Sequence, residues 1–389
     1  VGEVDVGEEA YAVEAHARGF YSLRVVDYNR LMMRAVILNP QDLSFPGGAE
    51  RYAALIGKLL EKRGFSVTFA TLRSVPQSAD LLVLNGGSGT LLWSGAPWIV
   101  RAQRVWVIPH ESLFHAALFA YPHLQKEIAL ILSHFLKHAF NYWKKRKHIY
   151  LIAVSSQNSK HLETVFGVKP ICLPNGVNVR PEVTVRARSL ASQLDGLPWG
   201  MIVSRWDWAK NPRVIAQLAK TLPEDMALLM RITPDGIPAL RVKVGLDRWP
   251  PIQRSNLMWL NYSMPKEELW GLMSLAKFVL VPSAYEAFGY VIVEAASLGV
   301  PVFTTPVGVG KEFESDPVLR QLLLRVPPHG SQSPEAVWLQ VRSVLFDNAQ
   351  NKLALQRSLK SFAHSYTLKL WEQSVDALLK ETFAERYHV

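Results

Sequence analysis

Two glutamates with seven residues between them, Glu286 and Glu294, are the side chains of this sequence best placed to do chemistry. They lie in the stretch SAYEAFGYVIVEAASLGVPVFTTPVGVG, residues 283–310. Ionised carboxylates accept hydrogen bonds, so this pair could hold the hydroxyl groups of a sugar or a ribose. A helix that begins between them would offer backbone N–H groups, which favour phosphate. Together these groups suit a sugar nucleotide.

The sequence around the glutamates predicts a strand, a loop, a helix and a second strand. The apolar run 278–282 predicts the first strand and 300–304 the second. Residues 290–298 predict a short helix, which Gly299 would close. In an open parallel sheet, ligands bind at the carboxyl ends of strands, and Glu286 follows such an end.

Positive charge follows another predicted strand, 201–204, in the segment IVSRWDWAKNP. A diphosphate leaving group gathers negative charge as its bond breaks, and fixed cations there stabilise the transition state more than the ground state. Arg205 and Lys210 could serve this purpose. The alternative is two solvated cations near a helix start, although the helix dipole disfavours cations at that position.

The first half of the chain offers two further candidates. Gly47 and Gly48 follow the predicted strand 34–38, where glycine allows close approach of the backbone to a ligand. The alternative is a tight turn. His110 follows the predicted strand 104–108 and either contacts a ligand or serves the structure. A second glycine run, GGSG at 86–89, is predicted to be a loop.

These motifs together resemble those of the retaining glycosyltransferases of family four, which have the GT-B fold. The stretch 283–310 resembles the signature of that family. The matching segments before it are PGGAERYAALIGKLLEKRGFSVTFA (46–70), PNGVNV (174–179) and IVSRWDWAKNP (202–212), which occur in the family's order. The resemblance covers roughly Arg34 to Pro306.

The resemblance implies an α/β protein with two Rossmann-like, doubly wound parallel-sheet domains that face a cleft. It implies retaining transfer of a sugar from a UDP or GDP sugar to a hydroxyl of a glycan or lipid-linked glycan. Neither a metal nor another cofactor is expected. A non-catalytic GT-B protein that binds sugar nucleotides or scaffolds a partner is the alternative, and the cations and both carboxylates argue against it.

The resemblance also assigns roles to individual residues. Arg205 and Lys210 would hold the diphosphate, Glu286 the transferred sugar and Glu294 the ribose. The implied donor-binding set is Gly47, Gly48, Arg205, Lys210, Glu286, Ala287, Phe288, Gly289 and Glu294. The implied catalytic set is His110, Arg205, Lys210 and Glu286. Independently of the resemblance, Glu294 stands among apolar neighbours, where a carboxylate needs partners.

The alternation of apolar runs with helical patterns predicts two α/β domains. Residues 33–176 would form the acceptor domain and 177–369 the nucleotide-sugar domain, with a C-terminal helix at about 370–389 returning to the first. Residues 1–32 would be an N-terminal extension. Besides those already named, strands are predicted at 66–70, 81–84, 150–154, 170–173, 227–231 and 257–260. Helices are predicted at 49–63, 122–145, 156–165, 211–221 and 265–275.

Composition narrows the class of protein. The 389 residues carry a net charge of +10, which attracts anions, but no nucleic-acid-binding module is evident. The single cysteine, Cys172, excludes an intrachain disulfide and fits a reducing compartment. Neither an apolar run of membrane-spanning length nor a secretory signal is evident, so a cytoplasmic protein is expected. No Asp-x-Asp or His/Cys ligand pattern indicates a metal site.

One basic segment has two interpretations. Residues 126–147, KEIALILSHFLKHAFNYWKKRK, carry an apolar stripe at helical spacing and end in four cations. Such a helix could lie on an anionic membrane, which would fit a lipid-linked acceptor. It could equally pack on the first domain with a solvated end.

Overall fold

The computed structural model of the chain describes residues 32–39, 47–87, 95–111, 125–194, 196–233, 252, 254–260, 262 and 264–384. The predicted extension 1–32 therefore lies outside the described residues except for Met32. Side chains are not described for Glu111, 125–130 and Leu132.

The first sheet has the strand order β2-β1-β3-β4-β5-β6, and neighbouring strands pair in parallel. Its strands are β1 (Arg34–Leu38), β2 (Ser66–Ala70), β3 (Ala79–Gly87), β4 (Ala102–Glu111), β5 (His148–Ala153) and β6 (Ile171–Cys172). The helices on it are α1 (Gly48–Lys62), α3 (Ala96–Arg101), α5 (Gln125–Lys144), α6 (Ser156–Phe166) and α14 (Leu368–Thr382).

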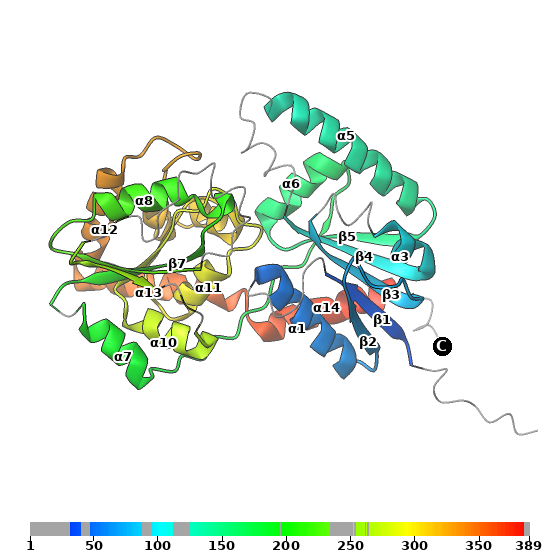
Figure 1. Ribbon diagram of the computed structural model, residues 1–389, viewed down its shortest axis with the longest axis horizontal. Helices are drawn as coiled ribbons and strands as arrows, with labels where there is room; N and C mark the ends of the chain where they lie inside the picture. The colour runs from blue at the N-terminus through cyan, green and yellow to red at the C-terminus, as the bar shows by residue number, and fades with distance from the viewer. Residues whose placement is uncertain are drawn as a thin grey trace, which may run out of the picture. The chain divides into compact units, whose positions relative to one another are not determined.

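Side chains that alternate along the strands separate the two faces of this sheet. In β1, Ala35 and Ile37 belong to the core that includes α1 and α14, whereas Val36 and Leu38 belong to the core beneath α3, α5 and α6. Figure 1 shows α5 and α6 on one face of the sheet and α1 and α14 on the other. Both faces are thus covered, which explains why the strands are continuous apolar runs.

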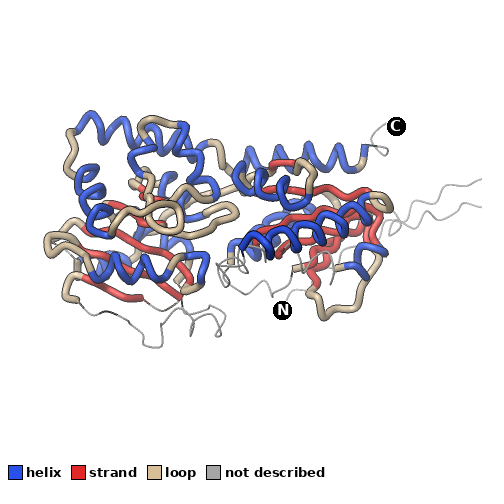
Figure 2. The backbone as a smooth tube through the Cα atoms, turned by 90° about the horizontal axis from the view of Figure 1, so that it is seen from above, coloured by secondary structure: helices blue, strands red, loops and turns tan. Residues whose placement is uncertain are grey.

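The second sheet has the order β11-β10-β7-β8-β9, again with parallel pairing. Its strands are β7 (Trp199–Arg205), β8 (Ala227–Thr233), β9 (Leu257–Leu260), β10 (Phe278–Val281) and β11 (Val302–Thr304). The α-helices are α7 (Val185–Ser192), α8 (Pro212–Lys220), α10 (Lys266–Leu275), α11 (Tyr290–Ser297), α12 (Pro334–Leu345) and α13 (Ala349–His364). The 3-10 helices are η3 (Trp208–Lys210), η4 (Gly308–Ser315) and η5 (Leu319–Leu322). Figure 2 shows strands in red between helices in blue in both sheet domains.

Strand order fixes where ligands can bind. In the second sheet the chain runs outward from β7 to β9 and then returns to β10 on the other side of β7. In the first sheet the order changes direction between β1 and β3. A crevice forms at the carboxyl ends of strands where the order reverses. The loops that carry the predicted site residues leave these strands.

Helix α14 packs on the first sheet, where the resemblance puts the last helix. Arg104 Nε donates to the carbonyl oxygen of Thr382 at 2.5 Å, and Trp106 Nε1 donates to Thr382 Oγ1 at 3.0 Å. Arg63, the residue that caps the end of α1, makes hydrogen bonds of 2.7 and 2.6 Å to Asp376 of α14. These hydrogen bonds hold the Asp376 carboxylate ionised and lower its pKa.

Most predicted elements form within a few residues of their expected bounds, with three kinds of difference. Helices α3 and α7 were not expected, because six and eight residues are too short for a clear helical period. Strand β3 continues through Gly87, so the predicted loop 86–89 is wrong at its first two residues, and the last two lie outside the described residues. Strand β11 begins two residues later than predicted.

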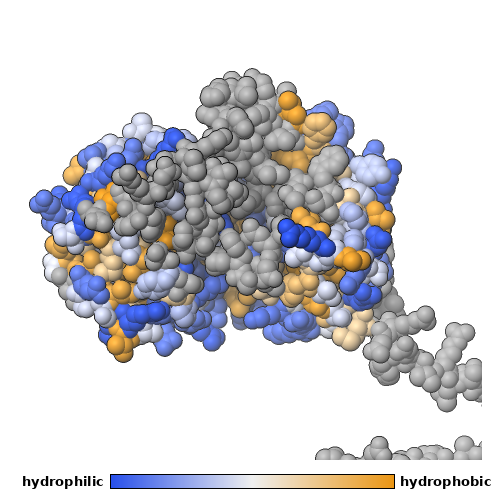
Figure 3. All heavy atoms as spheres, viewed as in Figure 1, coloured by the Kyte–Doolittle hydropathy of each residue, from blue (hydrophilic) through white to orange (hydrophobic). Residues whose placement is uncertain are grey.

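The basic segment 126–147 forms α5, whose apolar residues face two ways. Leu136 and Phe140 are buried against the first sheet. A second row is half exposed and consists of Ile131, Phe135 and Tyr142. Figure 3 shows orange, hydrophobic residues on the surface in this region, next to blue, hydrophilic ones.

The cations at the end of α5 are also of two kinds. Lys147 Nζ donates to the carbonyl oxygens of Val100 and Ala102 at 3.1 and 2.9 Å, so it ties the helix end to α3 and β4. Lys144 and Lys145 are exposed. No described helix is long and apolar enough to cross a membrane.

Candidate functional site

The loops after β7 and β10 meet at the switch point of the second sheet. Backbone N–H groups of Ala284 and Tyr285 donate to the carbonyl oxygen of Ala209 at 2.8 and 3.1 Å. Asn211 has a left-handed conformation, with φ of 59°, and its side chain donates to the carbonyl oxygen of Pro282 at 3.0 Å. These bonds hold the cation-bearing loop against the loop that carries Glu286.

Lys210 and Glu286 form the centre of this site. Lys210 Nζ donates to Glu286 Oε1 at 2.6 Å, and Ser283 Oγ donates to the same oxygen at 2.8 Å. Both bonds go to Oε1, and a carboxylate has further acceptor positions on its second oxygen. Lys210 carries three N–H donors, so it can keep this bond and still donate to a phosphate.

Arg205 lies at the end of β7 and pairs with Asp207 through an Nε–Oδ2 distance of 3.3 Å. Asp207 also caps η3 by accepting from the backbone N–H of Lys210 at 3.3 Å. Both predicted cations are therefore ion-paired and partly buried, with side-chain exposures of 26% for Arg205 and 20% for Lys210. The two cations are therefore not freely solvated: Arg205 pairs with a carboxylate of its own loop, and Lys210 pairs with Glu286 of the loop after β10.

Tight backbone packing shapes the segment between the glutamates. Gly289 precedes α11 with φ of 94°, a conformation that residues with a side chain rarely adopt. Phe288 is buried, and its carbonyl oxygen accepts from the N–H of Val309 at 2.8 Å. A side chain at Gly308 would collide with that oxygen, at 2.3 Å from the added Cβ. Ala287 accepts from Ser155 Oγ of the first domain at 2.6 Å.

Glu294 is buried on α11, and its partner comes from the first domain. Arg51 Nη1 of α1 donates to Glu294 Oε1 at 2.5 Å. Gly47 caps α1, and a Cβ added at Gly48 would lie 3.3 Å from the Tyr290 ring. The structure thus brings Gly47 and Gly48 to the start of α11.

His110 lies at the carboxyl end of β4, as predicted, but its partners belong to the first domain. Its Nε2 is 2.7 Å from Asn85 Oδ1, and the Asn85 amide donates to Asn39 Oδ1 at 2.8 Å. Burial lowers the pKa of His110 to about 3, so the ring is neutral. With Nε2 donating to Asn85, Nδ1 can only accept. A neutral His110 can accept a hydrogen bond from a hydroxyl group through Nδ1, but it cannot supply a positive charge.

Sequence reasoning missed Arg51, Asn39 and Asn85. Asn39 directly follows β1 and Asn85 lies near the end of β3, so both mark the switch point of the first sheet. Their position at strand ends was a usable signal. Arg51 had none, because it lies within a helix among ordinary helix-forming residues.

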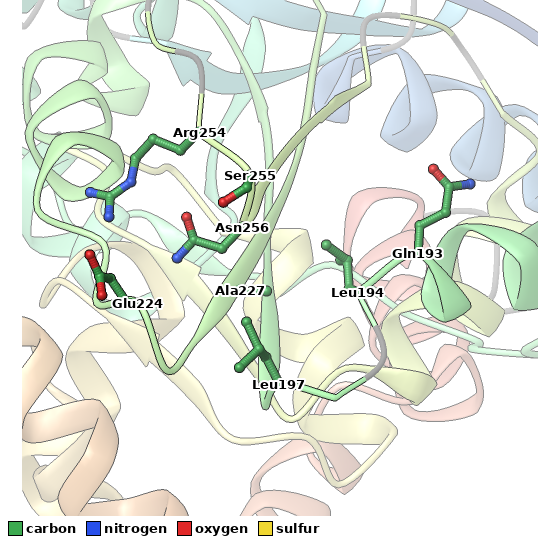
Figure 4. A pocket seen from close by; sticks show the side chains of 8 residues that line it. All are labelled: Gln193, Leu194, Leu197, Glu224, Ala227, Arg254, Ser255 and Asn256. Carbon is green, nitrogen blue, oxygen red and sulfur yellow. The ribbon is translucent and has the colours of Figure 1, made fainter.

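Two cavities lie away from these residues. One, of about 490 Å³, lies at the amino ends of β7, β8 and β9, the sheet edge opposite Arg205 (Figure 4). Its polar groups serve the structure, since Asn256 Nδ2 donates to the carbonyl oxygens of Pro223 and Met226, both at 2.8 Å. The other, of about 550 Å³, lies where the chain passes between the sheet domains, beside Val177 and Thr367. Among the residues that the structure describes, no cluster of His, Cys, Asp and Glu could hold a metal ion.

Comparison with known proteins gives a family match for part of the chain. Residues 253–329 match the family described as "Glycosyl transferases group 1", and this segment contains Glu286 and Glu294. The chain is also 28% identical over 206 residues to D-inositol 3-phosphate glycosyltransferase of Corynebacterium urealyticum. That match covers 51% of this chain and 46% of the relative, so it spans about half of the relative's length.

Solved structures match over nearly the whole chain. Sucrose-phosphate synthase from Thermosynechococcus elongatus superposes with a TM-score of 0.66 at 16% identity, covering 91% of this chain and all of the other. Anabaena HepE in complex with UDP-glucose gives 0.62 at 18% identity, covering 90% of this chain and all of the other. These similarities show that the chain has the GT-B fold, as predicted.

Proposed function

We propose that this chain, which has the GT-B fold and matches the glycosyl transferases group 1 family over residues 253–329, is a retaining glycosyltransferase. It transfers a sugar from a nucleoside-diphosphate sugar to a hydroxyl of a glycan or lipid-linked glycan. One observation carries the proposal: at the switch point of the second sheet, Lys210 is bonded to Glu286 beside Arg205. Phosphate and sugar hydroxyls require these two kinds of group side by side.

A uridine nucleotide is the first donor to test. The Anabaena protein was solved in complex with UDP-glucose, and this chain shares its fold. A GDP sugar is the second. Glu294, behind the sugar-binding loop, would accept from the ribose hydroxyls. His110 Nδ1 would accept from a hydroxyl of the transferred sugar, from the first-domain side.

The reaction proceeds on one face of the sugar. The bond between the anomeric carbon and the diphosphate oxygen breaks while the acceptor oxygen bonds to the same face. The leaving diphosphate takes the acceptor proton. Arg205 and Lys210 stabilise the negative charge on the diphosphate, and this stabilisation is greatest in the transition state. The second oxygen of Glu286 orients the sugar hydroxyls.

The experiment that tests the proposal begins with a thermal-shift screen of UDP, GDP and ADP sugars. A donor at a hundredfold excess over its dissociation constant should stabilise the fold by about 2.7 kcal/mol. Donors that bind are then incubated with hydroxyl acceptors and with water. Release of nucleoside diphosphate together with a product of unchanged anomeric configuration supports the proposal. Binding without turnover on any acceptor or water favours the non-catalytic alternative.

Activity is expected to survive chelation. In the proposed function, Arg205 and Lys210 donate to the diphosphate in the role that a divalent ion would otherwise fill. The initial rate in EDTA, at a large excess over trace metal, should equal the rate without it. A rate that falls in EDTA and returns with magnesium would contradict metal independence.

We also propose that α5 docks on an anionic membrane at the cytoplasmic face. Ile131 and Phe135 are each 54% exposed at helical spacing, and exposed cations follow at the end of the helix. Apolar insertion beside Lys144 and Lys145 suits a surface with anionic lipid.

Replacing Ile131 and Phe135 by serine should weaken binding to phosphatidylglycerol vesicles by about tenfold or more, because each loses apolar surface that would enter the membrane. Cosedimentation measures this. Phe346→Ser is the matched control, since Phe346 is 67% exposed in the second domain. Equal binding of wild type, double variant and control would show that α5 is not the docking surface.

A further inference from the structure

Arg51 is the charged residue of α1 that reaches the proposed ribose site. Its guanidinium bonds to Glu294 at 2.5 Å, and the two side chains are 14% and 7% exposed. The residues are 243 positions apart in the chain and belong to different sheet domains. A buried carboxylate that loses its charge partner is strongly disfavoured. The charge partner of the buried Glu294 carboxylate thus comes from outside its own domain.

Aromatic rings fix the orientation of Arg51. Its Cζ lies 4.2 Å from the centre of the Tyr290 ring and 5.8 Å from that of Trp270. Tyr290 is the first residue of α11, and Gly48, three residues before Arg51, approaches the edge of the same ring. A planar guanidinium stacks on such rings while it donates sideways, which a lysine ammonium does not.

The bond leaves part of the Glu294 carboxylate available. Arg51 donates to Oε1, and a carboxylate has about four acceptor positions over its two oxygens. The bond to Oε1 therefore fixes the orientation of the whole carboxylate and does not use the acceptor positions of Oε2. Lys266 lies near the same pair, since burial and Arg51 lower its pKa while Glu294 raises it. The Glu294 carboxylate thus keeps acceptor positions for two further hydrogen bonds.

The need to join the domains does not by itself explain Arg51. Ser155 Oγ already donates to the carbonyl oxygen of Ala287 at 2.6 Å, and Gln157 Nε2 donates to that of Pro306 at 3.2 Å. These contacts hold the first domain against the donor loops through uncharged groups. Burying a charge on each side costs desolvation free energy that one more uncharged contact would not cost. The Arg51–Glu294 pair is accounted for if the protein needs the Glu294 carboxylate held in one orientation.

We infer that Arg51 is a positioning residue for the donor: it holds the Glu294 carboxylate in a fixed orientation, so that a first-domain helix sets the affinity of the second domain for the ribose. The inference rests on the proposed function, in which Glu294 accepts from the ribose hydroxyls. It extends that function because donor affinity then depends on the contact between Arg51 of α1 and Glu294 of α11. It also assigns Arg51 no contact with the nucleotide.

The test measures nucleotide affinity in the full chain by calorimetry with UDP, GDP and ADP. The variants are Arg51→Met, Arg51→Lys, Glu294→Gln and the double variant Arg51→Met/Glu294→Gln. Arg63→Met is the matched control, because Arg63 caps the end of the same helix and also pairs with a carboxylate, Asp376, at 2.6 Å. Thermal melting without ligand checks that each variant is folded, and steady-state kinetics separate kcat from KM.

We expect Arg51→Met to weaken nucleotide binding about tenfold or more and to raise the donor KM, because the charge-assisted bond that orients Glu294 is lost. The value of kcat should change less than about threefold, because Arg51 affects donor binding and not the chemical step. Arg51→Lys should recover part of the affinity, and Arg63→Met should bind like wild type. In the Glu294→Gln background the Arg51 substitution should have no further effect on affinity.

Three results would overturn the inference. Wild-type nucleotide affinity in folded Arg51→Met would show that Glu294 binds the ribose without being oriented by Arg51. Tighter binding would show that Arg51 competes with the ribose for Glu294. An undiminished Arg51 effect in the Glu294→Gln background would show that Arg51 acts by another route. Failure of the proposed function looks different, because Glu294→Gln alone would then bind nucleotide like wild type.

Discussion

Lys210→Met is expected to lower kcat by about 10²–10³-fold, the usual cost of removing one group that stabilises developing negative charge. Lys210 is 20% exposed and bonded to Glu286, so its ammonium is fixed before the donor arrives. Nucleotide affinity should fall much less, since Arg205 remains. The measurement is single-turnover transfer at saturating donor, together with nucleotide affinity.

Lys220→Met is the matched control for Lys210, because Lys220 ends α8 with an exposed side chain. It should keep wild-type turnover. If Lys210→Met instead raised KM at constant kcat, Lys210 would bind ground state and transition state equally, and its proposed role in the chemical step would be wrong.

Glu294→Gln is expected to weaken nucleotide binding by at least about a hundredfold. Two hydrogen bonds from ribose hydroxyls to an ionised carboxylate would be lost or weakened, each worth roughly 1.5–3 kcal/mol. Glutamine is the informative replacement, because it keeps the shape of the side chain. Alanine would leave Arg51 without its partner in a buried setting and could unfold the interface.

Calorimetric titration with the nucleotide that binds wild type measures the Glu294 effect. Glu335→Gln is the matched control, since Glu335 is an exposed glutamate in the first turn of α12. Affinity in folded Glu294→Gln equal to that of wild type would remove the ribose assignment, whatever the catalytic residues do.

The elements of the fold could largely be predicted from the sequence, because both sheets are parallel and their strands are buried apolar runs. Strands β1, β2 and β9 have their predicted bounds. The loops that carry Arg205, Lys210 and Glu286 were found because they follow such strands. Strand order and register, however, depend on which strands pair, and the local sequence pattern of a strand does not determine its partner.

Pairs between domains were beyond sequence reasoning for the same reason. Burial of Glu294 was predicted from its apolar neighbours, but Arg51, its partner, lies on a helix of the other domain. The apolar stripe of 126–147 showed a similar limit. Periodicity predicted one face, whereas the structure buries Leu136 and Phe140 and leaves Ile131 and Phe135 half exposed.

The position of α14 has a consequence for how the protein folds. Arg104 and Trp106 of β4 find their partner, Thr382, 278 and 276 residues further along the chain. Helix α14 can therefore cover this face of the first sheet only after the whole second sheet has been synthesised. Closing a loop of this length is entropically costly and slows folding. The first sheet domain should thus form late on the ribosome, and residues 33–176 expressed alone should expose an apolar sheet face and aggregate.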